Sequence, residues 1–376
     1  MARMRVVVLT GGNSAEREIC LKSGAKVMAA LDPARYDAVA VDLAQITDGR
    51  AEQLAGALMA PTGYDPKALC DGFGTEVPKH QPSVPKHQQR QGQQSAALAA
   101  SGERSVEHVP AKPDVVFIAL HGGAGENGTV QGMLDLFGIP YVGSGVLASA
   151  MALNKIVSKK LFEREGIPTP KWAPLSAWRR SNAAKEALDA VDLPCVIKPA
   201  TEGSSLGVTI VRKAEQLEPA LELAFRYGKE ALAEGFIAGV EITGPVLGND
   251  DAQVLPLVEI VPGRGFEFYD FDAKYTEGAT DEIIPARISD AQAARARELT
   301  LRAHKALGCR GMSRVDMIVG TDDVYVLELQ TIPGLTGTSL LPRAAEAAGI
   351  SFPQLVDRLI ELALEEREGN GSRRGV

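Results

Sequence analysis

The sequence predicts a protein of mixed α/β class that begins with an open α/β domain. Residues 5–9 form an apolar run, residues 16–31 show the periodicity of a helix, and residues 36–42 form a second strand-like run. A strand, a helix and a strand in this order are typical of a parallel sheet covered by helices. The chain has 376 residues, which is too long for one ordinary hydrophobic core, so we expect two or three domains.

The first domain is expected to span residues 1–150. Its first strand ends in the turn Gly11-Gly12, and residues 115–120 (VVFIAL) form a buried strand before the glycine-rich loop HGGAGENGT. Residues 64–112 differ from their surroundings, because they contain the near-repeat VPKHQ at 77–81 and 84–88 and few residues that could enter a core. This composition predicts a mobile surface insertion.

A central domain is expected from residue 151 to residue 241. A helix at 156–165 ends at GIPTP, and a helix at 183–190 and a strand at 195–198 follow. The loop TEGSSLG then leads into the strand VTIVR, the amphipathic helix LEPALELAFRYG and the strand ALAEGFI. Alternating helices and strands of this length again predict mixed α/β structure.

The remaining residues, 242–376, are expected to form a C-terminal domain. Strands are predicted near 254–260, followed by a polar stretch at 262–286, a long alanine-rich helix at 290–307 and a terminal helix at 352–366. Residues 312–330 read as a hairpin whose turn is Gly320-Thr321-Asp322-Asp323. Pro245 is unexpected within a strand, because proline removes one hydrogen-bond donor of the ladder.

Composition excludes several classes of function. The formal net charge of −8 and the pI of about 5.4 argue against general nucleic-acid binding. No apolar stretch reaches membrane-spanning length and no signal peptide is evident, so we expect a cytoplasmic protein without a membrane partner. The cysteines Cys20, Cys70, Cys195 and Cys309 form no CxxC spacing and are expected to be reduced, buried thiols.

The hairpin at 312–330 is the strongest chemical signal. Strand alternation places Arg314 and Asp316 on one face, and Glu328 and Gln330 on one face of the partner strand. Folding at the turn brings Asp316 roughly opposite Leu327 and Glu328. Two carboxylates this close favour an intervening cation, and oxygen ligands suit Mg²⁺. The alternative is that these residues form the solvated outer face of an edge hairpin.

Three further segments each allow two interpretations. Lys198 and the loop with Ser204 and Ser205 could contact phosphates, or the loop could be an ordinary glycine turn. Glu234 and Glu241 could be surface acids, or one could bind a ribose. Residues 331–342 (TIPGLTGTSLLP) could direct backbone N–H groups at an oxyanion, or could only cap the next helix through Thr338 or Ser339. No GxxxxGK[ST] phosphate loop occurs in the chain.

Taken together, these segments resemble the D-alanine–D-alanine ligase family of ATP-grasp enzymes. The resemblance rests on motifs in family order over nearly the whole chain outside residues 64–112. These are GGNSAERE (11–18), LHGGAGENGTVQGMLDLFGIPYVGSGVLASA (120–150), GIPTP (166–170), KPATEGSSLG (198–207), DAKYT (272–276), RVD (314–316) and LELQTIPGLTGTSLLP (327–342), together with Lys155. It implies a three-domain ATP-grasp fold of α/β (α+β) class with an N-terminal open α/β domain.

The resemblance implies that ATP and two Mg²⁺ ions, with Mn²⁺ as a substitute, are bound between the second and third domains. The residues implied to contact ATP are Lys155, Lys198, Ser205, Glu234, Phe236, Ile237 and Glu241. Those implied to hold the metal ions are Asp316, Glu328 and Gln330. The implied reaction joins two D-alanines through an acyl phosphate for peptidoglycan precursor synthesis.

The same resemblance assigns roles around the two amino acids. The implied catalytic residues are Glu16, Ser204, Tyr275, Arg314 and Gly334, and the implied substrate-binding residues are His121, Lys274, Ser339 and Leu340. Lys274 and Tyr275 lie in the polar stretch 262–286, which is expected to close as a lid over the site. The resemblance also implies a homodimer.

Four positions depart from the family pattern. Gln330 stands where Asn is usual, Cys20 replaces Ser, Asn154 replaces Asp, and Pro245 interrupts a strand. Gln330 is the most consequential, because its extra methylene displaces the amide oxygen from an ion that demands distances of about 2.0–2.1 Å. Two alternatives therefore stay open: a ligase with D-lactate or D-serine as second substrate, and a nucleotide-binding protein that has lost catalysis.

Overall fold

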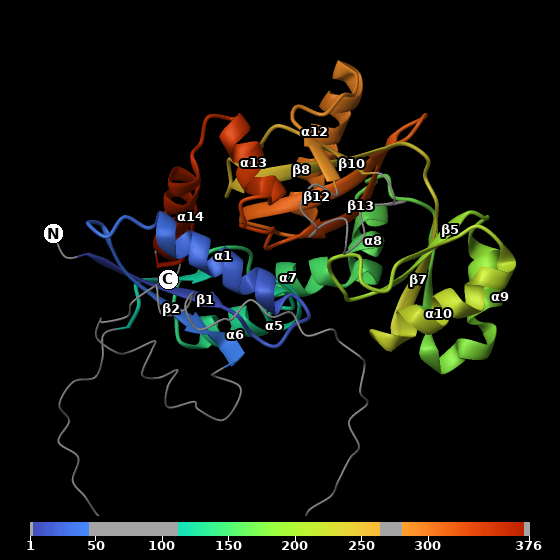
Figure 1. Ribbon diagram of the computed structural model, residues 1–376, viewed down its shortest axis with the longest axis horizontal. Helices are drawn as coiled ribbons and strands as arrows, with labels where there is room; N and C mark the ends of the chain where they lie inside the picture. Colours follow the sequence, from blue (N-terminus) through green and yellow to red (C-terminus); the bar gives the residue numbers. More distant parts are fainter. Residues whose placement is uncertain (1–2, 45–111, 264–279, 372–376) are drawn as a thin grey trace, which may run out of the picture.

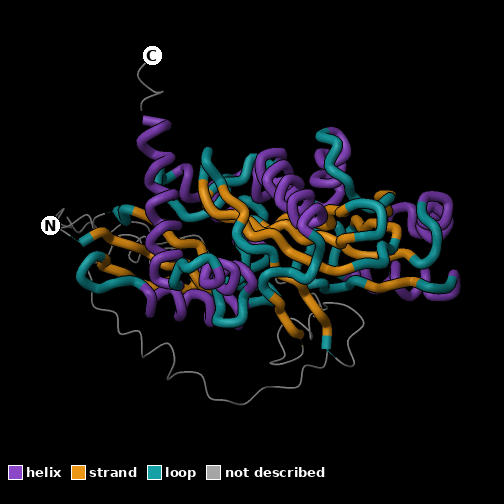
Figure 2. The backbone as a smooth tube through the Cα atoms, turned by 90° about the horizontal axis from the view of Figure 1, so that it is seen from above, coloured by secondary structure: helices purple, strands orange, loops and turns teal. Residues whose placement is uncertain are grey.

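A computed structural model of the chain describes residues 3–44, 112–263 and 280–371, with side chains up to residue 365. Three sheets follow one another along its long axis (Figure 2). In Figure 1 the C-terminal sheet lies between the N-terminal sheet, on the left, and the central sheet, on the right. The insertion predicted at 64–112, apart from its last residue, lies outside the described residues. The domain boundaries at residues 150 and 241 stay predictions.

The N-terminal part is a parallel sheet with the strand order β2-β1-β3, as the strand–helix–strand pattern predicts. Its strands are β1 (Met4–Thr10), β2 (Tyr36–Asp42) and β3 (Val115–Ile118). β1 and β3 are buried along most of their length, which is typical of parallel strands covered on both faces. The helices of this part are α1 (Arg17–Ala30), α5 (Gly123–Glu126), α6 (Thr129–Leu136) and α7 (Val146–Leu153).

The turn after β1 requires glycine. Gly11 has a φ of +67°, and a Cβ built on it would lie 2.1 Å from Asp42 Oδ1. The backbone N–H of Gly12 donates to the same oxygen at 2.9 Å, and the Arg17 guanidinium pairs with Asp42 at 2.5 Å. These contacts fix the start of α1, and therefore the position of Glu16 directly before it.

The central part is an antiparallel sheet with the order β4-β7-β5-β6. Its strands are β4 (Trp172–Ser176), β5 (Cys195–Pro199), β6 (Thr209–Val211) and β7 (Glu230–Gly235), and α8 (Lys155–Arg164) precedes them. α9 (Arg180–Ala190) and α10 (Leu217–Arg226) cover the sheet through a cluster of buried alanine, leucine, valine and isoleucine side chains. The opposite face is left to line a cavity.

The C-terminal sheet has the order β11-β10-β8-β12-β13, and β9 pairs with β8 outside this path. Its strands are β8 (Val240–Gly248), β9 (Gln253–Val254), β10 (Val258–Pro262), β11 (Thr280–Ile283), β12 (Gly311–Val319) and β13 (Val324–Gln330). The helices are α12 (Asp290–Ala306), α13 (Leu340–Ala347) and α14 (Phe352–Gly371). α14 thus extends beyond the end predicted at residue 366.

Pro245 is accommodated where the ladder of β8 changes partner. Its carbonyl accepts from the N–H of Leu255, in the segment between β9 and β10, at 2.9 Å. The backbone carbonyl and nitrogen of a strand residue point to the same side of the strand. The nitrogen of Pro245, which has no hydrogen to donate, therefore faces the irregular segment between β9 and β10. Pairing of β8 with β12 continues from Val240 to Gly248.

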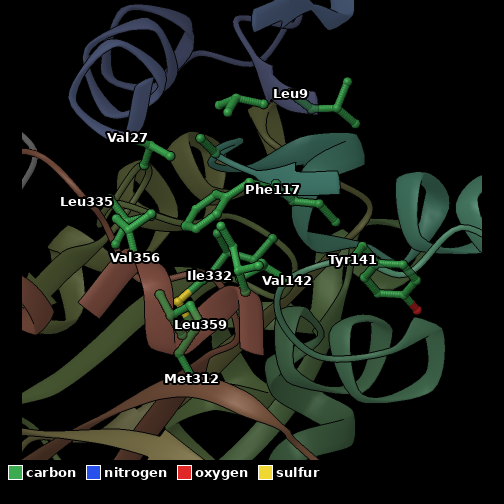
Figure 3. Packing of buried hydrophobic residues seen from close by; sticks show 14 of the residues in the cluster. Leu9, Val27, Phe117, Tyr141, Val142, Met312, Ile332, Leu335, Val356 and Leu359 are labelled. Atoms are coloured by element: carbon green, nitrogen blue, oxygen red, sulfur yellow. The ribbon is translucent and has the colours of Figure 1, made fainter. Parts of the chain in front are cut away.

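The N-terminal sheet shares its core with the end of the chain. Helix α14 packs on β3, and Figure 3 shows Phe117 of β3 on the side of Ile332 and of Val356 and Leu359 of α14. Cys20 and Cys195 are buried thiols, as predicted, while Cys309 is partly buried and Cys70 lies outside the described residues. No described helix combines the length and apolar character needed to cross a membrane.

His304 is a buried titratable group that is not among the predicted site residues. It lies on α12, is 2% exposed, and its Nδ1 lies 2.7 Å from the Ser313 hydroxyl on β12. Its Nε2 has no hydrogen-bond partner among the described residues. Burial, with a smaller contribution from Lys305, lowers the pKa of His304 to about 4.

We therefore expect His304 to make folding sensitive to mild acid. Between pH 6.5 and pH 4 the unfolded chain binds a proton at this residue that the folded chain does not, so the free energy of unfolding falls as pH falls. Urea unfolding should show that His304→Gln reduces the loss of stability between pH 7 and pH 4.5 by about 2 kcal/mol. Equal losses in both proteins would contradict this, and measurements at pH 7–8 serve as the control.

Candidate active site

A cavity of about 440 Å³ lies between the central sheet and the C-terminal sheet. One wall comes from β5, β7 and the loop after β5, and the other comes from β8, β10, β12 and β13. Nine of the predicted site residues line it: Lys155, Lys198, Ser205, Glu234, Phe236, Ile237, Glu241, Asp316 and Glu328. The cavity therefore joins residues that are far apart in sequence and were predicted to contact ATP or metal.

The β12–β13 hairpin has the predicted register. Asp316 is paired with Glu328 and Arg314 with Gln330, and the ladder shifts directly after Asp316. Arg314 donates to both oxygens of Asp316, from Nε to Oδ1 at 2.9 Å and from a terminal nitrogen to Oδ2 at 2.8 Å. Thr243 on β8 donates to Oδ1 of Asp316 at 2.7 Å. Both Arg314 and Asp316 are buried, so the alternative of a solvated outer face is wrong.

Lys155 faces the second carboxylate of the hairpin. Its Nζ lies 3.1 Å from Glu328 Oε2 and donates to the Glu202 carbonyl at 2.6 Å. The two hairpin carboxylates are thus neutralised by two cationic side chains, Arg314 and Lys155. A divalent cation could take the same role, because Asp316, Glu328 and Gln330 offer only oxygen ligands.

Protein groups alone do not complete a metal site here. In the described ranges, no three His, Cys, Asp or Glu side chains cluster closely enough to hold a metal ion. Two carboxylates and one amide still fit Mg²⁺, since this ion is usually held by one or two carboxylates together with substrate phosphates and water. The donor set therefore suits an ion that arrives with a nucleotide.

Glu234 is the centre of a buried charge cluster at the opposite wall. Lys198 Nζ lies 2.5 Å from its Oε2, and Lys159 Nζ forms an ion pair with its Oε1. Burial opposes ionisation of Glu234, but Lys159 and Lys198 outweigh this and lower the pKa of the carboxyl. Lys159 was not among the predicted site residues.

The residues that directly follow β7 form an apolar end of the large cavity. Phe236 and Ile237 come after β7, and the guanidinium of Arg212 lies 5.8 Å from the centre of the Phe236 ring. Glu241 lines the cavity from β8. A flat apolar surface with a carboxylate on each side is suited to a heteroaromatic ring carrying a polar sugar.

A second cavity of about 60 Å³ lies where the N-terminal part meets the hairpin. It is lined by eight predicted residues: Glu16, His121, Ser204, Arg314, Gln330, Gly334, Ser339 and Leu340. They come from the position directly before α1, from the loops after β3 and β5, from the hairpin, and from the segment between β13 and α13 with the first residue of that helix.

The Ser204 hydroxyl bonds to the Glu16 carboxylate and thereby joins the central part to the N-terminal part. Ser204 and Ser205 have φ values of +48° and +57°, a left-handed conformation that is uncommon for residues other than glycine. Such backbone strain persists only where surrounding contacts hold it, and it is common at ligand-binding loops. Ser204 lines the second cavity and Ser205 the large one.

His121 is held rigidly beneath the second cavity. Its Nε2 lies 2.9 Å from the Ser23 hydroxyl, and its backbone N–H donates to the Cys20 sulfur at 3.0 Å. Burial lowers the pKa of His121 even though the charge of Glu16 acts in the opposite direction. Cys20 is therefore a packing partner of the histidine loop.

The segment after β13 curves tightly into α13. A Cβ on Gly334 would lie 2.6 Å from the Ser339 hydroxyl, so a larger residue there would displace that hydroxyl. Ser339 precedes the first residue of α13, Leu340, and its hydroxyl accepts from the Thr336 N–H at 2.9 Å. The helix N-terminus lies at the cavity and favours a negatively charged group.

A third cavity of about 20 Å³ shares lining residues with both of the others. It shares Lys155, Glu202 and Glu328 with the large cavity, and Glu126, Gly203 and Gln330 with the second cavity. Groups bound in the two larger cavities would therefore meet beside the hairpin.

Glu126 is a lining residue that sequence reasoning missed. Burial, followed by the negative charge of Glu16, raises the pKa of Glu126 to about 8. The signal was present in the loop HGGAGENGT, where an acid stands between glycines directly after a buried strand. Lys274 and Tyr275, which were also predicted to act here, lie outside the described residues.

Comparison with known proteins gives one consistent result. Residues 5–144 match the family model described as D-ala D-ala ligase N-terminus, and residues 161–361 match the one described as D-ala D-ala ligase C-terminus. The D-alanine–D-alanine ligase of Syntrophobacter fumaroxidans is 45% identical over 97% of this chain and 99% of its own length. The enzyme of that name from Desulforamulus reducens is 40% identical over 96% of this chain and 99% of its own length.

Solved structures agree with the sequence matches. The D-alanine–D-alanine ligase of Bacillus anthracis in complex with ATP is 30% identical, with a TM-score of 0.72 over 98% of this chain and all of that one. The VanG D-Ala:D-Ser ligase of Enterococcus faecalis is also 30% identical, with a TM-score of 0.71 over 96% of this chain and all of that one. Both similarities extend over all three sheets.

Proposed function

The chain belongs to the D-alanine–D-alanine ligase family of ATP-dependent ligases, and we propose that its neighbouring cavities hold ATP and two D-alanines during ligation. Members of this family act in peptidoglycan synthesis. The observation that carries the proposal is the small third cavity, whose lining residues belong in part to each of the larger cavities. It is the place where a γ-phosphate and a carboxylate would meet.

The large cavity is proposed as the ATP site. Phe236 and Ile237 would hold the base, and Glu241 would bind the ribose hydroxyls. Lys155 and Lys198 would contact phosphate oxygens, where their positive charges offset those of the nucleotide. Ser205 would add a contact from the loop that lies over the phosphates.

Asp316, Glu328 and Gln330 are proposed to hold two Mg²⁺ ions together with phosphate oxygens. Bound there, the ions would neutralise the charge that builds up on the phosphates during transfer. Arg314 now shields Asp316, and Lys155 shields Glu328, at 2.8 Å and 3.1 Å. Each cation would then be free to turn towards the substrates.

The proposed reaction has two steps. A carboxylate oxygen of the first D-alanine attacks the γ-phosphorus, the bond to ADP breaks, and an acyl phosphate forms. The uncharged amine of the second D-alanine then attacks the acyl carbon, phosphate leaves, and the amine loses a proton. Arg314 and the backbone N–H of Gly334 are proposed to stabilise the oxyanion of this second step.

The second cavity is proposed to orient the amino acids. Glu16 would hold the ammonium group of the first D-alanine, with Ser204 beside it and His121 near both substrates. Ser339 and the start of α13 at Leu340 would receive the carboxylate of the second, where helix N–H groups favour an anion. Lys274 and Tyr275 stay predicted lid contacts. A cytoplasmic location, where ATP is supplied, completes this proposal.

A different second substrate is the alternative that a specific observation favours. The D-Ala:D-Ser ligase from Enterococcus faecalis matches this chain as well as the D-alanine–D-alanine ligase from Bacillus anthracis does. The position for the second substrate contains Thr336, Thr338 and Ser339, whose hydroxyls could accept an additional hydroxyl group.

ADP release tests the proposed function directly. We expect purified protein with ATP and Mg²⁺ to release ADP and phosphate in proportion to added D-alanine, and mass spectrometry to identify D-alanyl-D-alanine. D-Serine or D-lactate added with D-alanine should give less mixed product than dipeptide. ATP turnover that is the same with and without any D-amino acid would overturn the proposal. Lys198→Met is the matched control, and we expect it to lose activity.

Gln330→Asn tests the metal assignment. Shortening the side chain by one methylene should bring the amide oxygen closer to an ion held by Asp316 and Glu328. We expect the half-saturating Mg²⁺ concentration for ADP release to fall about fivefold. Gln253→Asn, at an exposed position on β9, is the control and should change nothing. No gain in metal affinity or rate in Gln330→Asn would refute the assignment.

We also propose that the chain forms a homodimer through an apolar patch on α6 and α7. The patch consists of Leu136, Phe137, Val146 and Leu147, with exposed fractions of 89%, 57%, 40% and 70%. α6 and α7 lie against one another, and Val146 lies beside Gly132, one turn before Leu136 on α6. Exposed apolar surface of this kind commonly marks a protein–protein contact.

Leu147→Asp should therefore convert a dimer into a monomer. A charge placed in a self-complementary apolar contact faces its own copy across the two-fold axis, so it is desolvated and repelled. Sedimentation equilibrium should give twice 39.8 kDa for the unchanged protein and 39.8 kDa for the variant. Leu188→Asp, at an exposed leucine of α9, should stay dimeric. A monomeric parent protein, or a dimeric Leu147→Asp, would exclude this interface.

A further inference from the structure

Lys159 is a buried cation for which the proposed reaction has no role. It lies on α8, is 0% exposed, and forms an ion pair with Glu234. Its Nζ also donates to the Thr169 hydroxyl at 2.5 Å, and that hydroxyl donates to the Val326 carbonyl of β13 at 2.8 Å. A lysine is rarely buried so completely unless a fixed partner holds it.

Glu234 thus carries two ammonium groups on one carboxylate. Lys198 occupies Oε2 at 2.5 Å from β5, and Lys159 occupies Oε1 from α8. The two lysines differ in access, because Lys198 lines the large cavity together with Glu234 and Lys159 does not. Only Lys198 can reach a ligand without rearrangement of the backbone.

We propose that Lys159 is a positioning residue that keeps Glu234 neutralised, so that Lys198 can leave Glu234 and bind a nucleotide phosphate. This inference rests on the proposed ATP site, and in it Lys159 is the cation that stays paired with Glu234 throughout. A buried carboxylate that loses its only cation is strongly destabilised, whereas one that keeps a second cation is not. With Lys159 in place, the exchange of Lys198 between carboxylate and phosphate costs little.

The effects on the pKa of Lys159 agree with a Glu234 carboxylate that is shared between Lys159 and Lys198. Burial lowers the pKa of Lys159 to about 8, the charge of Glu234 opposes that change, and the charge of Lys198 adds to it. Glu328 on β13 has a smaller effect in the same direction as Glu234. Movement of Lys198 to a phosphate would remove the repulsion between the two ammonium groups and strengthen the pair that remains.

Lys159→Met tests the proposal. Methionine matches the length of the lysine stem but leaves Glu234 with Lys198 as its only cation. We expect the KM for ATP, and the Kd for ATP measured by calorimetry, to rise about tenfold or more, because drawing Lys198 to the phosphates would then leave the buried Glu234 without a cation. kcat and the KM for D-alanine should change less than threefold. Lys159→Arg should restore most of the affinity, and Lys160→Met, at the exposed neighbouring position, should have no effect.

The double variant separates this role from simple packing. In a Glu234→Gln background no carboxylate holds Lys198, so adding Lys159→Met should leave the affinity for ATP within about twofold of Glu234→Gln alone. Equal weakening of ATP binding by Lys159→Met in both backgrounds, or no weakening in either, would overturn the inference. Thermal unfolding of each variant checks that it is folded. Absence of D-alanine-dependent turnover in the unchanged protein would instead overturn the proposed function.

Discussion

Pairing of buried and partly buried carboxylates with cations is the constraint on which this site depends. In the walls of the large cavity Asp316 lies against Arg314, Glu328 against Lys155, and Glu234 against Lys198 and Lys159. Asp316 and Glu234 are buried, so loss of their cations would cost several kcal/mol, whereas Glu328 is only partly buried. These three carboxylates are met by four cationic side chains, so the site can accept a polyanion and its metal ions by exchanging partners.

The fold supplies these pairs from separate sheets. Strand alternation in the β12–β13 hairpin places Asp316 opposite Glu328, and pairing with β8 brings Thr243 to the same carboxylate. The central sheet presents Lys198 and Glu234 on paired strands, and α8 adds lysines from behind and beside it.

The parts of the site that local rules govern could be predicted from sequence. The register of the hairpin was predicted from the alternation of its side chains and from its short turn. The elements β1, α1 and β2 were predicted from the spacing of apolar residues along the chain. The positions of Lys155, Glu241 and Leu340 came from resemblance to a family and from no pattern in the residues. Lys159 and Glu126 were missed because the residues they contact lie on distant segments of the chain. A single sequence also does not distinguish a buried lysine on a helix from an exposed one.

The shared core of the first sheet and the last helix has a consequence during synthesis. Phe117 of β3 lies on the side of the N-terminal sheet that Val356 and Leu359 of α14 cover, so a ribosome must finish almost the whole chain before that face is enclosed (Figure 3). Until then the nascent chain exposes apolar strands to chaperones and to aggregation. A premature stop codon near the 3′ end of the message would thus damage the part of the protein that was made first.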